Sequence, residues 1–151
     1  MSRHSSTEIQ AQQNPALQLA TLGGGCFWCT EAAFEAIKGV VDVESGYAGS
    51  DDPRANYEAV CTGQTGLAEV AQVLFDPAII NYEQILNVFF AVHNPTTLNQ
   101  QGADRGTQYR SVIFTHSNEQ DSIARSLIPS VAAAWDAPVV TEIVQINHYT
   151  R

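Results

Sequence analysis

Apolar stretches bounded by turn-forming residues predict alternating strands and helices along the chain. Five strands are expected, over residues 16–22, 40–47, 67–75, 109–115 and 139–143. A shorter extended segment, residues 57–61, is expected to form a hairpin with the third strand, because the residues between them are rich in Gly and Thr. A polar loop over residues 48–56 precedes this hairpin, and loops of that length are often functional.

Helices are expected between these strands. The first runs from residue 26 to about residue 37 and ends at a Lys-Gly pair. A second starts at a cap formed by Asn81 and Gln84, and a third starts in the same way at Ser117. We expect Pro129 to interrupt the third helix. The second helix presents one apolar face, made of Ile85, Leu86, Phe89 and Phe90.

The order of elements predicts the fold. Without the segment 57–61, residues 17–115 run strand, helix, strand, strand, helix, strand, which is the split β-α-β order. We therefore expect an α+β protein with a ferredoxin-like split β-α-β core, a mixed sheet and long functional loops. Residues 1–15 are expected to form a mobile polar tail, and residues 16–151 a single catalytic domain.

Composition narrows the classes of partner. The 151 residues are 44% hydrophobic and 15% charged, as in an ordinary globular domain. Seven basic and sixteen acidic residues give a formal net charge of −9, and the basic residues are scattered, which argues against a nucleic-acid partner. No apolar run approaches membrane-spanning length. We expect a monomer that does not associate with membranes.

Cysteine usage indicates the compartment. Three cysteines, two of them only three positions apart, fit reactive or metal-binding thiols better than a disulfide framework. The polar N-terminal residues lack the apolar core of a secretory signal. We therefore expect a cytoplasmic protein.

Cys26 is the candidate nucleophile. It follows the run Gly23-Gly24-Gly25 and opens a predicted helix, where unpaired backbone N–H groups and the helix dipole favour a thiolate. The alternative is a small buried cysteine at a strand–helix junction, since free cysteine is often buried. The glycine run lacks the third glycine of a dinucleotide-binding loop and the lysine of a phosphate-binding loop, which argues against nucleotide binding.

Cys26 and Cys29 form a C-x-x-C pair on the first turn of this helix. Such a pair fits a redox couple, half of a metal site, or a nucleophile beside a structural cysteine. Only Cys61 and four histidines are available to complete a zinc site, and there is no second C-x-x-C. We therefore expect no bound metal.

Several segments resemble, in order, the motifs of the A-type peptide-methionine sulfoxide reductases. They are Gly25-Cys26-Phe27-Trp28 with Glu31, Tyr57-Glu58-Ala59-Val60-Cys61, Thr65-Gly66-Leu67-Ala68-Glu69-Val70, His93-Asn94-Pro95-Thr96, and Gln101-Gly102-Ala103-Asp104-Arg105-Gly106-Thr107-Gln108-Tyr109-Arg110-Ser111. The resemblance covers roughly residues 17–143, and relative to this family the chain is short at its C-terminal end.

The resemblance implies a reaction and roles for particular residues. The reaction is reduction of the S epimer of methionine sulfoxide, free or in proteins, with thioredoxin or another external thiol as reductant and no bound cofactor. Cys26 is implied as the nucleophile and Glu69 as the acid. The remaining implied site residues are Phe27 and Trp28, which wall the methyl pocket, and Tyr57, Asp104 and Tyr109 on its polar side.

These residue types suit the reaction. A sulfoxide sulfur is a poor electrophile until its oxygen is protonated, and a partly buried Glu69 would hold a proton near neutral pH. Tyr57 and Tyr109 can donate hydrogen bonds to that oxygen. The alternatives are an outward-facing strand carboxylate for Glu69 and core positions for the tyrosines.

The second half of the cycle needs another thiol. Attack leaves Cys26 as a sulfenic acid, which a thiol converts to a disulfide. Cys29 is nearest in sequence, although a disulfide within one helical turn requires the helix start to loosen. Cys61 and direct reduction by an external thiol remain alternatives.

The chain departs from the family pattern at four positions. Residues usual in the family are replaced by Leu67, Phe90, Asn94 and Gln100. Two other functions therefore remain open: a general thiol-disulfide oxidoreductase that uses Cys26 and Cys29 without Glu69, and a degenerate domain that binds methionine sulfoxide without reducing it.

Overall fold

A computed structural model describes residues 6–25, 27–49, 67–97, 99–101, 104–146 and 149–150, and gives the backbone alone at residues 6, 27–29, 100, 104–105, 107 and 150. The polar loop 48–56 therefore lies almost entirely outside the described residues, as does the expected hairpin formed by residues 57–66.

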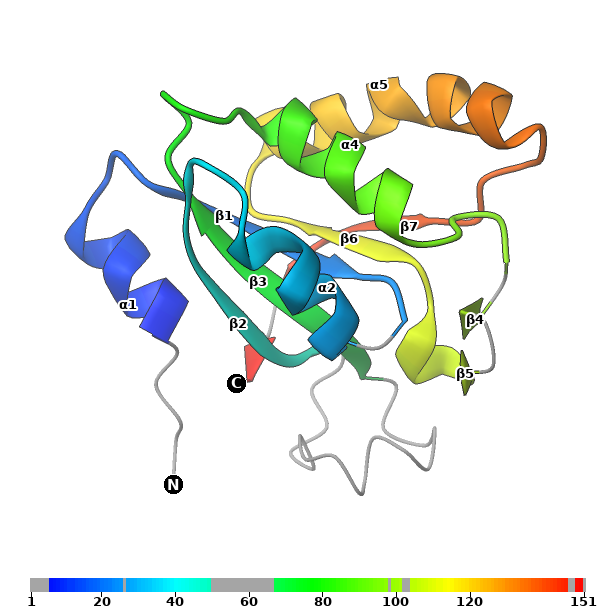
Figure 1. Ribbon diagram of the computed structural model, residues 1–151, viewed down its shortest axis with the longest axis horizontal. Coiled ribbons are helices and arrows are strands. Elements are labelled where there is room, and N and C mark those ends of the chain that lie inside the picture. Colours follow the sequence, from blue (N-terminus) through cyan, green and yellow to red (C-terminus); the bar gives the residue numbers. More distant parts are fainter. Residues whose placement is uncertain are drawn as a thin grey trace.

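A six-stranded sheet forms the centre of the protein, in the order β7-β6-β1-β3-β2-β8 (Figure 1). Its strands are β1 (Gln18–Gly23), β2 (Val40–Ala48), β3 (Ala68–Phe75), β6 (Val112–Thr115), β7 (Glu142–Gln145) and β8 (Tyr149–Thr150). Neighbouring strands are antiparallel except β6 and β7, so the sheet is mixed. Two short strands, β4 (Gln100–Gln101) and β5 (Asp104–Arg105), pair separately.

The expected ferredoxin-like core is confirmed. Its elements follow one another as β1, α2 (Phe27–Glu35), β2, β3, α4 (Tyr82–Val92) and β6. The four core strands lie side by side in the order β6-β1-β3-β2, which is the split β-α-β arrangement. This order leaves the C-terminal end of β1 and the N-terminal end of β3 at the same end of the sheet, because these two strands run antiparallel.

Helices α2, α4 and α5 (Asn118–Trp135) cover one face of the sheet (Figure 1). The main hydrophobic core lies beneath them, and it includes the four apolar residues predicted for α4. Both predicted helix caps are present: Asn81 and Gln84 exchange side-chain and backbone hydrogen bonds, and Ser117 accepts from the backbone of Gln120. The predicted interruption is wrong, since α5 runs through Pro129 to Trp135, which is 40% exposed.

Two predicted strands begin later than expected. Tyr109 ends a short 3₁₀ helix, η1 (Thr107–Tyr109), because its N–H bonds to the carbonyl of Gly106, and β6 starts three residues further on. Val140 donates its N–H to the carbonyl of Pro95, and the last long strand, β7, starts at Glu142.

The opposite face of the sheet carries a buried polar chain. Thr7 Oγ1 donates to Gln72 Oε1 at 2.6 Å, and Gln72 Nε2 donates to Thr21 Oγ1 at 3.0 Å. Thr21 Oγ1 lies 2.8 Å from His116 Nε2. Thr7 also bonds to Glu44, which accepts a second hydrogen bond from the Tyr149 hydroxyl in β8.

Thr7 belongs to helix α1 (Ser6–Gln13), where the sequence predicts a mobile tail. The prediction does not hold for these residues. Thr7 is fully buried, and Gln10 Nε2 donates to Asp42 Oδ2 at 2.8 Å. The helix therefore docks through polar side chains rather than through an apolar stripe, and α1 lies apart from the other helices in Figure 1.

Among the described residues, no helix is long and apolar enough to cross a membrane.

Candidate active site

The candidate active site lies where β1 passes into α2. β1 ends at Gly23, and α2 starts at Phe27, immediately after the candidate nucleophile. Cys26 itself lies outside the described residues. Gly25 has a φ of +91°, a left-handed conformation that glycine adopts without strain, so the glycine run turns the chain sharply at this point.

Gly23 brings this turn against the neighbouring strands. A Cβ at Gly23 would lie 2.9 Å from Val112 Cγ1 in β6 and 3.1 Å from the carbonyl oxygen of Glu69 in β3. Glycine at this position therefore allows the close approach of the neighbouring strands. This contact places the backbone of Glu69 beside Gly23, the last residue of β1. Gly23 is three residues before Cys26 in the sequence.

Glu69 is buried. It is the second residue of β3, lies opposite Tyr47 in the β2–β3 pairing, and has only 2% of its surface exposed. Alternation along β3 puts Glu69 on the same side of the sheet as Val73, which belongs to the core beneath the helices. The outward-facing alternative for this carboxylate is therefore excluded.

Residues 107–109 approach the same strand. η1 packs against β3, Gln108 within it is buried, and Tyr109 at its end is half-buried. Gly106 introduces this turn with a φ of +135°. The structure thus brings the predicted Tyr109 to the strand that carries Glu69.

The other predicted site residues are described only in part. Phe27, Trp28 and Cys29 form the first turn of α2, and Asp104 lies in β5, but their side chains lie outside the description. Tyr57 and Cys61 lie wholly outside the described residues.

Residues 18–151 match the family model described as peptide methionine sulfoxide reductase. The chain belongs to this family. It is 52% identical over 138 residues to the peptide methionine sulfoxide reductase MsrA of Polynucleobacter asymbioticus, covering 90% of this chain and 73% of the relative. It is 55% identical over 142 residues to that of Ralstonia nicotianae, covering 93% and 74%.

Solved structures of family members share the fold. Reduced Mxr1 from Saccharomyces cerevisiae superposes with a TM-score of 0.83 at 36% identity, covering 89% of this chain and 79% of that one. Methionine sulfoxide reductase A of Corynebacterium diphtheriae gives 0.81 at 32% identity, covering 91% and 70%. Mxr1 in complex with Trx2 gives 0.68 at 26% identity, covering 89% and 80%.

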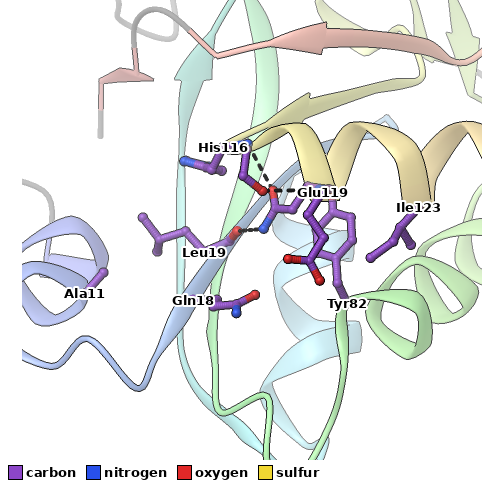
Figure 2. A pocket seen from close by; sticks show the side chains of 9 residues that line it. Ala11, Gln18, Leu19, Tyr82, His116, Glu119 and Ile123 are labelled. Carbon is purple, nitrogen blue, oxygen red and sulfur yellow. Dashed lines mark hydrogen bonds between the residues drawn. The ribbon is translucent and has the colours of Figure 1, made fainter.

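A cavity of about 380 Å³ lies away from the candidate reductase site (Figure 2). It is lined by Gln18 and Leu19 at the start of β1, whereas the glycine turn follows the end of that strand. The polar side chain of Gln120 already bonds twice within the protein, because its Nε2 donates to the Leu19 carbonyl at 2.8 Å and its Oε1 accepts from the backbone N–H of His116 at 3.0 Å. Burial lowers the pKa of His116 to about 4. We assign no step of the reaction to this cavity.

Sequence reasoning assigned no role to several residues around the glycine turn. Tyr47 is paired with Glu69, His93 is buried beside Gly24, and Gln101 contacts Gly25. His93 and Gln101 each begin a segment that resembles a motif of the family, and this resemblance could have pointed to them. Tyr47 had no such signal, because its position depends on the register of two strands.

Proposed function

We propose that this chain reduces the S epimer of methionine sulfoxide, free or in proteins, to methionine, with Cys26 as the nucleophile. The observation that carries the proposal is the buried Glu69 beside the glycine turn from which Cys26 follows. Membership of the reductase family over residues 18–151 supports it. We take residues 16–151 as the catalytic domain on the same ground.

In the first step the Cys26 thiolate attacks the sulfoxide sulfur while Glu69 gives a proton to the sulfoxide oxygen. The oxygen then passes to the cysteine sulfur, so the substrate is reduced to methionine and Cys26 is oxidised to a sulfenic acid. The helix start favours the thiolate, and the nearby N–H dipoles are fixed before reaction. Tyr109 and Tyr57 donate to the oxygen as its negative charge grows.

The remaining residues shape the substrate site. Phe27 and Trp28 form an apolar wall for the methyl group and exclude water from the reacting sulfur. Asp104 completes the polar side. The reaction needs no metal or organic cofactor, because the thiol supplies both electrons.

The sulfenic acid is resolved by a second thiol. We propose that this thiol is Cys29, which lies in the first turn of α2, three residues after Cys26. The alternatives are Cys61 and an external thiol. The thiol displaces water from the sulfenic acid and forms a disulfide, which an external dithiol then reduces. Thioredoxin is the proposed reductant, supported by the likeness to Mxr1 in complex with Trx2. The reducing chemistry suits a cytoplasmic enzyme that repairs oxidised proteins.

A single-turnover experiment tests the nucleophile and the reaction together. Reduced protein is mixed with S-methionine sulfoxide, and methionine formed and thiols lost are counted for the wild type and for Cys26→Ser. We expect about one methionine per chain in the wild type and none in the variant. Folded wild-type protein that forms no methionine and keeps its thiols would overturn the proposal in favour of a binding domain.

The resolving thiol is tested with a matched pair of variants. Cys29→Ser should still form one methionine but lose the internal disulfide, whereas Cys61→Ser should keep both. Normal thioredoxin-driven turnover by Cys29→Ser would contradict the assignment.

Reduction of protein disulfides by Glu69→Gln at the wild-type rate would favour a general thiol-disulfide oxidoreductase instead.

A further inference from the structure

The glycine turn before Cys26 rests on two side chains from distant parts of the chain. A Cβ at Gly24 would lie 2.8 Å from both Cγ and Cδ2 of His93, and a Cβ at Gly25 would lie 2.8 Å from Cβ of Gln101. The imidazole ring and the Gln101 side chain therefore touch the backbone of the turn. We call these two residues the turn platform.

His93 is held at both ring nitrogens. Nδ1 lies 2.5 Å from the carbonyl oxygen of Phe89, and Nε2 lies 2.8 Å from Ser111 Oγ, which in turn lies 2.7 Å from Thr141 Oγ1. The ring also stacks on Phe89, with centroids 4.0 Å apart. The imidazole is therefore held by Phe89 in α4 and by Ser111, the residue before β6. Ser111 is itself bonded to Thr141, the residue before β7.

The donor and acceptor in each hydrogen bond that joins Phe89, His93, Ser111 and Thr141 can be assigned from the chemistry of the groups. Burial lowers the pKa of His93 to about 4, so the ring is neutral near neutral pH and carries one proton. A backbone carbonyl only accepts, so Nδ1 carries that proton and Nε2 accepts from Ser111. Ser111 then accepts from Thr141. Each polar group of the chain has one defined role, which keeps the ring in one orientation.

Gln101 is fixed with similar strength. Its Nε2 donates to the Asn94 carbonyl at 2.5 Å, and its Oε1 accepts from the Asn94 N–H at 2.8 Å. The side-chain amide thus pairs with the backbone of the residue that follows His93. The two members of the platform are locked to each other through consecutive residues at the end of α4.

We propose that His93, with Gln101, is a positioning residue for the nucleophile: the platform fixes the backbone of Gly24 and Gly25, and through it the approach of the Cys26 sulfur to the substrate. The inference rests on the proposed function, in which Cys26 attacks the sulfoxide. A turn of three glycines has many accessible conformations, so a contact from outside must select one. Misplacement of a nucleophile by about 1 Å can lower a rate roughly 100-fold.

The test replaces His93 with Asn and uses His116→Asn as a matched control. His93 is buried and His116 is half-buried, and burial lowers the pKa of each to about 4, but the His116 ring bonds to the Thr21 side chain on the opposite face of the sheet and not to the glycine turn. The two variants should therefore lose comparable stability. Asn keeps a donor toward the Phe89 carbonyl but removes the ring beneath Gly24.

Two readouts separate positioning from stability. The first is the rate of Cys26 alkylation by iodoacetamide against pH, in a background of Cys29→Ser and Cys61→Ser. The second is the single-turnover rate of methionine formation. For His93→Asn we expect a single-turnover rate roughly 10- to 100-fold lower and an altered alkylation profile. His116→Asn should match its parent in both, at a similar loss of unfolding temperature.

An unchanged alkylation profile and turnover rate in folded His93→Asn would overturn the proposal while leaving the proposed function intact. If His93→Asn does not fold, Ser111→Ala decides, because it keeps the ring and removes only the donor to Nε2. That variant should shift both readouts in the same direction by a smaller factor, and no shift would overturn the proposal. A parent that forms no methionine would contradict the proposed function, and the alkylation profiles would still test the platform.

Discussion

Glu69 and Tyr47 lie directly opposite each other in the pairing of β2 and β3, and both are almost fully buried. An acidic side chain is thereby held in a low-dielectric environment beside a phenol. The sheet supplies this arrangement through strand register alone. The backbone position of the proposed acid is therefore set by the pairing of the two strands.

The Glu69→Gln variant should keep the fold and lose the acid. We expect its single-turnover rate of methionine formation to fall by about 10²- to 10⁴-fold, the usual contribution of a positioned acid. Glu44→Gln is the control, because Glu44 is equally buried but lies on the other face of the sheet. Equal single-turnover rates for Glu69→Gln and the wild type would remove Glu69 from the mechanism.

Removing the proline from α5 should stabilise the protein. Pro129 is exposed within an uninterrupted helix, where it cannot donate to the carbonyl four residues earlier. We expect Pro129→Ala to raise the free energy of unfolding by about 1–2 kcal/mol in urea denaturation. Ser130→Ala, at the next exposed position, should change it by less than about 0.5 kcal/mol. A loss of stability in Pro129→Ala would show that the proline fits α5 without cost.

Stability should fall as the pH is lowered from 6.5 toward 4. Burial lowers the folded-state pKa of both His93 and His116 to about 4, against 6.5 in the unfolded chain. Over that window the unfolded state binds more protons, so each histidine removes up to about 3 kcal/mol of stability as pH falls. Above pH 6.5 neither contributes a slope. Urea denaturation at several pH values should show a shallower decline in His116→Asn, and an unchanged slope would contradict the assignment.

Docking of α1 should depend on the Thr7 hydroxyl. Thr7→Val keeps the shape and removes the donor to Gln72, so we expect the free energy of unfolding to fall by about 1–3 kcal/mol. Gln12→Ala, at an exposed position of the same helix, should change it by less than about 0.5 kcal/mol. Amide hydrogen exchange should show faster exchange in α1 of Thr7→Val. Equal exchange in the two variants would mean that other contacts hold the helix.

Features encoded by neighbouring residues were predictable from the sequence. The caps at Asn81 and Ser117 depend on residues three positions away, and the apolar face of α4 depends on helical spacing. The order of strands and helices then fixed the ferredoxin-like core. For the same reason, the glycine turn could be read from a short stretch of chain, and the role of Cys26 stays a prediction.

Features that depend on distant contacts were missed. Helix α1 has no apolar stripe. It is held by hydrogen bonds from Thr7 to Glu44 and Gln72, which lie 37 and 65 positions further along the sequence. Tyr109 has the pattern of a strand residue, but the bond to Gly106 curls it into η1. Likewise, no pattern near Gly24 in the sequence predicts that His93 fills the space beside it.

The exposed end of α5 also gives the protein a usable optical reporter. The chain has two tryptophans, Trp28 in the first turn of α2 and Trp135 at the last residue of α5. Replacing Trp135 with Phe would leave a single indole, two residues from Cys26. Its emission could then follow oxidation and reduction of the nucleophile in real time, without any added dye.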